Sequence, residues 1–139
     1  MVNKMFADWR EARRLKRAFA AEIRAILELI ARDRLVELIE AEITAASSRK
    51  MTGIEVNFRS NYNYVFIGAA GKLGLLPSRQ VERIIAFHYH VQLMIERMEI
   101  MSRENESDDI PYAQSVVQIM RETQELGRDL VNELELGNH

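Results

Sequence analysis

The glycine-rich segment 68–73 is where the chain comes closest to a phosphate-binding motif. Such a loop has the pattern G-x-x-x-x-G-K-[ST], in which backbone amides hold the phosphates and the hydroxyl after the lysine binds magnesium. Gly71 and Lys72 fit this pattern, but Phe66 stands at the first glycine position and Leu73 replaces the hydroxyl residue. No alternation of strands and helices surrounds the segment. We therefore expect no nucleotide site here, and we expect the small residues to pack a short helix closely against a neighbour.

His88 and His90 are the only close pair of histidines that could bind a metal. Residues two apart on a helix point about 200° from each other, so these two side chains cannot share an ion if the segment is helical. A metal centre in a helical bundle would need Glu-x-x-His pairs on two helices, and the sequence has none. We predict no metal site, and we expect His88 to be buried or interfacial and bonded to a neighbour.

Residues suited to enzymatic catalysis are not set apart by any pattern. The chain has no cysteine, which excludes a disulfide framework, a thiolate zinc site and a thiol nucleophile. Its serines and threonines lack a nucleophile motif, and no pair of carboxylates stands in an apolar setting that would tune it for acid–base chemistry. We predict that the protein is not an enzyme, with no catalytic residue, no cofactor and no small-molecule substrate.

A basic row near the N-terminus is the most specific feature of the sequence. Its members recur at helical spacings of three and four and therefore share one face; they are Arg10, Arg13, Arg14 and Arg17. Phe6 and Trp9 precede them. An excess of Lys and Arg is typical of the cytoplasmic flanks of membrane helices, and aromatic residues mark the boundary between lipid and water. Packing at a helix start is the alternative role for these two aromatics. We predict that the arginine row faces lipid or phosphate. A nucleic acid is the less favoured partner, because no reader motif is present.

Charge is distributed unevenly along the chain, although the net charge is only −2. Residues 1–34 hold nine Lys and Arg against five Asp and Glu, whereas residues 104–139 hold two Arg against nine acids. A basic start and an acidic end can pair in a folded bundle or lie solvated on separate faces.

The elements that must position these residues are helices. Apolar residues at spacings of three and four predict helices over 5–46, 61–73, 77–103 and 111–136, the first either continuous or broken at 32–34. Tyr64 and Ile67 are expected to face inward, and alternation over 54–58 suggests a short extended piece. We predict an all-α, antiparallel bundle of three long helices and one short helix. It forms a single domain over 1–139, in which 1–8 is a frayed lead.

Two segments resemble those of a group of small uncharacterised bacterial proteins, in which an N-terminal membrane anchor leads into a helical cytoplasmic domain. Residues 9–30, WREARRLKRAFAAEIRAILELI, are similar to the segment after that anchor, and KLGLLP at 72–77, preceded by NYNYVF at 61–66, is similar to a later turn. The resemblance covers about residues 9–95 and implies a bacterial origin. It assigns no catalytic residue. The anchor is missing from this sequence, which is therefore either a soluble member or one with an apolar run of about 20 residues upstream of Met1.

These observations predict a non-enzymatic interaction or scaffold domain, the cytoplasmic part of a membrane-anchored bacterial protein. Its expected partners are protein helices, including a second copy of itself, and a membrane surface. Its expected location is the cytoplasm, at the inner face of the membrane. The alternative is a soluble nucleic-acid-binding or regulatory protein that uses the arginine row.

Overall fold

A computed structural model of the chain describes residues 2–32, 34–45, 62–103 and 110–136. The elements are α1 (Val2–Arg32), α2 (Leu35–Ala45), α3 (Tyr64–Gly68), the 3₁₀-helix η1 (Ala70–Leu75), α4 (Ser78–Arg103) and α5 (Ile110–Leu136). Every element within these ranges is helical, which confirms the predicted all-α class. The extended piece expected at 54–58 lies outside the described residues.

The first predicted helix is two helices, α1 and α2, separated by a break at Arg34. Arg34 has a φ of 52°, in the left-handed region that non-glycine residues seldom adopt. Its N–H donates to the carbonyl of Ala31 at 3.1 Å, and its carbonyl accepts from the N–H of Leu38 at 2.9 Å, so the backbone stays hydrogen-bonded through the break. The change of direction allows α1 and α2 to pack against the same helix, α5.

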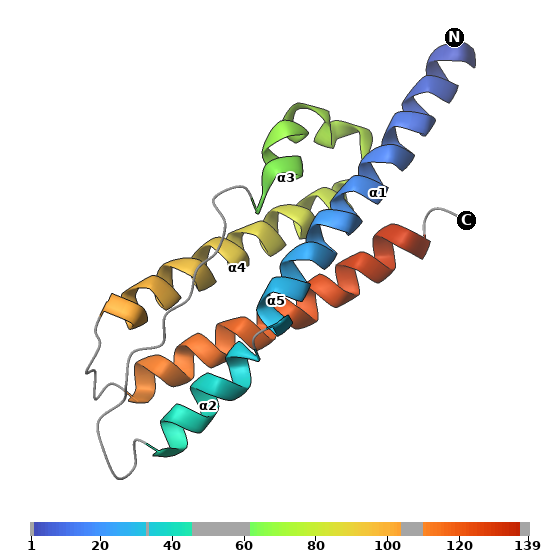
Figure 1. Ribbon diagram of the computed structural model, residues 1–139. Helices are drawn as coiled ribbons and strands as arrows, with labels where there is room; N and C mark the ends of the chain where they lie inside the picture. The colour runs from blue at the N-terminus through green and yellow to red at the C-terminus, as the bar shows by residue number, and fades with distance from the viewer. Residues whose placement is uncertain (1, 33, 46–61, 104–109, 137–139) are drawn as a thin grey trace.

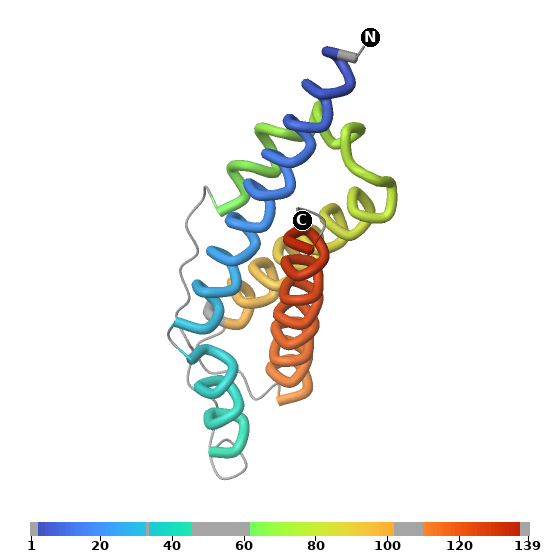
Figure 2. Tube along the Cα trace, turned by 90° about the vertical axis from the view of Figure 1, so that its right-hand side faces the viewer, coloured from blue at the N-terminus to red at the C-terminus, as the bar shows by residue number. Residues whose placement is uncertain are grey.

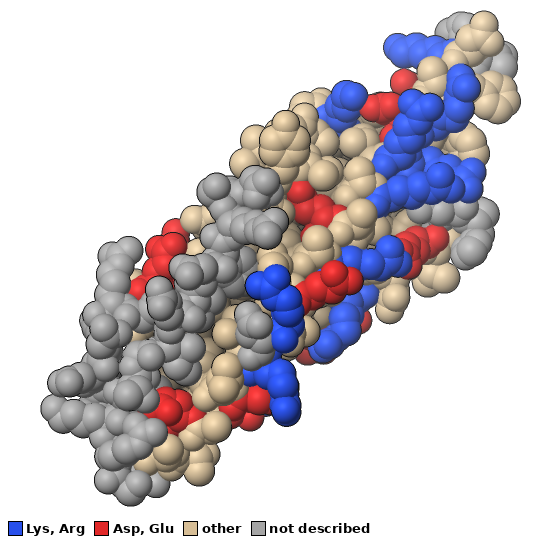
Figure 3. Space-filling view, in the orientation of Figure 1, with Lys and Arg blue, Asp and Glu red and all other residues tan. Residues whose placement is uncertain are grey.

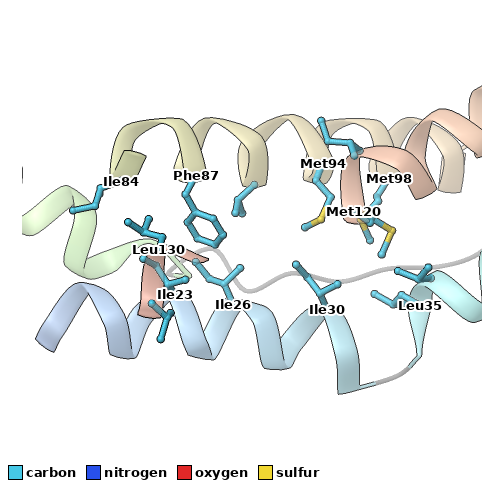
Figure 4. Packing of buried hydrophobic residues seen from close by; sticks show 14 of the residues in the cluster. Ile23, Ile26, Ile30, Leu35, Ile84, Phe87, Met94, Met98, Met120 and Leu130 are labelled. Atoms are coloured by element: carbon cyan, nitrogen blue, oxygen red, sulfur yellow. The ribbon is translucent and has the colours of Figure 1, made fainter. Parts of the chain in front are cut away.

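Helix α5 is the centre of the bundle, because it packs against α1, α2 and α4. Figures 1 and 2 show that α5 runs antiparallel to α1 and α4, whereas α1 and α4 run in the same general direction. The predicted antiparallel packing therefore describes the contacts of α5. Helices α1 and α4 face each other across the core (Figure 4).

Apolar stripes of the long helices form one core. On α1 the stripe consists of Phe19, Ile23, Ile26 and Ile30, each at most 1% exposed. Helices α4 and α5 contribute three fully buried methionines to this core, Met94, Met98 and Met120 (Figure 4). Methionine suits this position because its flexible side chain adapts to irregular gaps between helices.

Gly127 of α5 lies tightly packed between a side chain of α1 and a side chain of α4. A β-carbon at this position would lie 2.8 Å from Leu27 Cδ2 and 2.8 Å from Phe87 Cε2. Both distances are far below ordinary carbon–carbon contact, so any larger residue must displace its neighbours. Glycine here allows the three helices to meet and thereby sets the position of α1 against the other two.

Candidate functional site

The N-terminal segment of α1, defined here as residues 2–17, projects past the end of α5. Arg24 forms an ion pair with Glu135, which stands one residue before the end of α5. Gly127 faces Leu27 and α5 ends nine residues later, so in this antiparallel arrangement its end lies level with about Ala18, and the segment before it has no α5 beside it (Figure 1). At 1.5 Å per residue, the length of this segment from Val2 to Arg17 is about 22 Å. Residues 3–10 of this segment are all exposed.

One side of the segment is held against η1. The Lys72 ammonium lies 2.7 Å from a carboxylate oxygen of Glu11, and this hydrogen bond and charge hold the pKa of Glu11 below its usual value. Leu15, one turn further on the same face, is buried. The face of α1 that carries Glu11 and Leu15 is therefore turned toward the protein.

The arginine row lies on a different side of α1. Its four members line a shallow groove together with Trp9, and Figure 3 shows basic residues gathered along this end of the helix. The Arg13 guanidinium carbon stands 5.4 Å from the centre of the Trp9 ring, a cation–π contact. The structure therefore places all four predicted residues at one groove, while their role as ligands for lipid or phosphate stays a prediction.

The four arginines repel one another with little compensation. They form four neighbouring pairs at spacings of three and four, and each such like-charge pair costs a helix about 0.2–0.5 kcal/mol. Arg14 interacts with Glu11, whose pKa it helps to lower. Within the part of the chain that the structure describes, Arg10, Arg13 and Arg17 form no ion pair. An anion in the groove would relieve this repulsion.

Large apolar side chains beside the row are exposed. Met5 is 73% exposed, Phe6 59% and Trp9 58%. The alternative in which the two aromatics pack at the helix start is therefore wrong for this structure. The reason is geometric: α1 has run past the end of α5 at this point, so no core is present beneath these residues.

Pairing of the basic start with the acidic end of the chain, one of the two expected arrangements, is realised only in part. The pair between Arg24 and Glu135 joins the basic start to the acidic end, whereas Glu133 of α5 pairs with Arg83 of α4, which lies outside the basic start. The arginine row, lying beyond the end of α5, takes no share in these contacts.

Glu22 is a buried polar residue that the sequence analysis missed. It is 8% exposed, and its carboxylate accepts hydrogen bonds from the backbone N–H groups of Val65 at 2.5 Å and Phe66 at 3.0 Å. Burial raises the pKa of Glu22, and the two backbone hydrogen bonds act in the opposite direction. Glu22 thus ties the first turn of α3 to α1. Glu22 stands between Phe19 and Ile26 on the apolar stripe, and this position in the sequence is the signal that could have predicted its burial.

His88 lies next to this tether. Its Nε2 is 3.5 Å from Glu22 Oε1, and the ring of Phe66 stacks on it with centroids 4.1 Å apart. Burial lowers the pKa of His88 to about 4, so the ring is neutral at pH 7 and the contact is not an ion pair. The predicted burial of His88 is confirmed. The predicted bond to a neighbour is wrong, because neither ring nitrogen has a hydrogen-bond partner among the described residues.

The second histidine is turned elsewhere, as the helical spacing predicted. His90 Nδ1 lies 2.8 Å from the carbonyl oxygen of Ala86, on its own helix. Among the described residues, no three His, Asp or Glu side chains are grouped so that they could hold a metal ion. The Glu22 and His88 side chains are each 5% exposed, so the pair is closed to a substrate.

The segment from Tyr64 to Leu75 differs from its prediction in two ways. A β-carbon on any of its three glycines would meet nothing within 4 Å, so the expected close packing at Gly68 and Gly71 is wrong. Tyr64 is 76% and Ile67 66% exposed, so the expected inward face is also wrong. The two backbone bonds to Glu22 and the stacking of Phe66 on His88 turn the helix so that Phe66 faces the protein.

In the described ranges, no helix combines the length and the apolar character that crossing a membrane requires.

Comparisons with known proteins find no matching family model, no matching curated protein and no matching solved structure.

Proposed function

We propose that the protein is a helical interaction module that docks on an anionic membrane surface through the N-terminal segment of α1. One observation carries the proposal. Met5, Phe6 and Trp9 are exposed beside the arginine row, on a helix end that projects beyond the bundle. Apolar residues left in water at such a place suggest that another phase or partner covers them.

The energetics of a membrane surface match both parts of this segment. Each basic residue near an anionic bilayer contributes about 1 kcal/mol. Aromatic side chains favour the boundary between lipid and water, where the ring contacts apolar lipid and nearby cations contact the headgroups. Glu11 is held on the other side by Lys72, which keeps this carboxylate from opposing the anionic surface.

A nucleic acid fits the same segment less well. Phosphates of a duplex would satisfy the arginine row, but Met5 and Phe6 would stay in contact with water. Burying apolar surface is worth about 25 cal/mol per Å², and a bilayer supplies this term while a phosphate backbone does not. The exposed apolar residues therefore favour the membrane over the nucleic acid.

Co-sedimentation with lipid vesicles at 0.1 M salt tests the proposal. We expect binding to vesicles of phosphatidylcholine with phosphatidylglycerol and little binding to phosphatidylcholine alone. The double variant Arg10→Gln/Arg17→Gln should bind about 30-fold more weakly, because two charges near the surface are lost. The matched control Arg79→Gln/Arg128→Gln removes two exposed arginines elsewhere and should change binding less than twofold.

Three results would contradict the proposal. Equal weakening by both double variants would show that binding depends on overall charge and not on this segment. Tighter binding to duplex DNA than to anionic vesicles at the same salt concentration would support the nucleic-acid alternative. Binding to neither ligand would leave protein–protein contact as the use of the segment.

A further inference from the structure

We propose that the arginine row forms a seat for one phosphomonoester headgroup of an anionic lipid, the kind that phosphatidic acid presents. The inference rests on the proposed function and adds a ligand preference to it. It also assigns the four arginines a joint role that differs from general attraction to negative charge.

The spacing of the row supplies the first argument. Residues 10, 13, 14 and 17 stand at i, i+3, i+4 and i+7, which are the four corners of a rhombus on the surface of a helix. Neighbouring corners are about 5–6 Å apart at the β-carbon, well within the reach of an arginine side chain. All four guanidinium groups can therefore contact a single group of oxygens placed above the centre of the rhombus.

The groove is partly formed in advance. The cation–π contact with Trp9 holds Arg13 at its edge, with 5.4 Å between guanidinium carbon and ring centre. The Nε of Arg13 is buried and has no hydrogen-bond acceptor among the described residues. A buried donor without an acceptor is unfavourable, and a small movement of the side chain toward an anion in the groove would give this N–H an acceptor. Pre-positioning of Arg13 also lowers the entropy lost when a ligand binds.

The chemistry of guanidinium points to a phosphomonoester. Arginine presents planar pairs of N–H donors that bind two phosphate oxygens at once, which a lysine ammonium cannot do. A phosphomonoester has three unesterified oxygens and a charge between −1 and −2 near neutral pH, whereas the diester of phosphatidylglycerol has two such oxygens and a charge of about −1. Several arginines converging on one point can use the extra oxygen and the extra charge. Isolated surface cations would not distinguish the two headgroups beyond their charge.

The decisive experiment compares two vesicle preparations adjusted to the same zeta potential, one with phosphatidic acid and one with phosphatidylglycerol. We expect about tenfold tighter binding to phosphatidic acid, the gain of roughly one additional charge-assisted hydrogen bond. The quadruple variant Arg10→Lys/Arg13→Lys/Arg14→Lys/Arg17→Lys keeps the charge. It should bind phosphatidylglycerol within about twofold of the parent and lose the preference.

The outcomes separate this inference from the proposed function. Equal binding of the parent protein to both preparations, or a preference that the lysine variant retains, would overturn the phosphomonoester seat while docking on anionic membranes stands. Binding to neither preparation would overturn both. A second experiment measures the binding of glycerol phosphate in solution. If it bound as tightly as the phosphatidic acid vesicles, the ligand would be a free phosphate ester and the lipid assignment would be wrong.

Discussion

Replacing Glu22 with alanine should loosen α3 while leaving the rest of the bundle folded. The carboxylate accepts hydrogen bonds from the N–H groups of Val65 and Phe66, and the variant leaves both amides without this acceptor. Each unpaired amide in a partly buried setting costs about 1–3 kcal/mol. Burial raises the pKa of Glu22, which shows that its charged form is unfavourable there. Removing the carboxylate therefore offsets part of the free energy lost at the two amides. We expect a net loss of about 2–3 kcal/mol in the free energy of docking α3 onto α1.

Hydrogen exchange measures this loss where it occurs. A change of 2 kcal/mol should speed exchange of the Val65 and Phe66 amides about 30-fold, with little change at amides in the centre of α5. Glu22→Gln keeps one acceptor oxygen and should fall between the parent protein and the alanine variant. Glu28→Ala, exposed on the same helix, is the control and should alter stability by less than about 0.5 kcal/mol. Unchanged exchange at the two amides in Glu22→Ala would refute the role assigned to the tether.

Three further changes test other parts of the structure. Burial lowers the pKa of His88 from 6.5 to about 4, so its contribution to stability is complete above pH 6.5 and falls by about 3 kcal/mol toward pH 4. In urea unfolding, the free energy of unfolding should therefore decline less between pH 7 and 4.5 in His88→Gln than in the parent protein. An identical decline in both proteins would count against burial of a neutral ring. Gly127→Ala should lower the free energy of urea unfolding by about 1–2 kcal/mol, because crowding against Leu27 and Phe87 outweighs the gain in helix propensity. Gly71→Ala, the control, should be neutral or slightly stabilising. Equal effects of the two substitutions would contradict the close packing at Gly127. Phe6→Ala should weaken binding to anionic vesicles about tenfold through lost apolar burial, and an unchanged affinity would show that this ring stays in water.

The helices of this chain were predictable because their apolar residues repeat with a regular period. The predicted helices over 77–103 and 111–136 match Ser78–Arg103 and Ile110–Leu136 within one residue. The break near Arg34 was left open, because a left-handed residue other than glycine leaves no mark in the pattern of residue types. The short helix α3 was placed with the wrong face inward, since five residues are too few for the apolar period to define a side.

The arginine row and the buried tether differ in how far the sequence alone could reveal them. The spacing of the four arginines within one helix predicted that they share a face, and the structure adds that this end of α1 projects past α5. Glu22 acts on backbone groups 43 and 44 residues away, and such a contact depends on how α3 docks rather than on local spacing. The environment of His88 likewise comes from Phe66 and Glu22, which lie on other helices.

Fluorescence of Trp9, the single tryptophan of the chain, tests the central claim most directly. The ring is 58% exposed in the free protein and adjoins the arginine row, so it reports on the proposed membrane contact without a label. We predict a blue shift of its emission on adding vesicles that contain phosphatidylglycerol. The shift should reverse when salt is raised from 0.1 to 1 M, because the screening length falls from about 10 Å to 3 Å. An emission maximum that does not move at saturating anionic lipid would contradict docking through this segment.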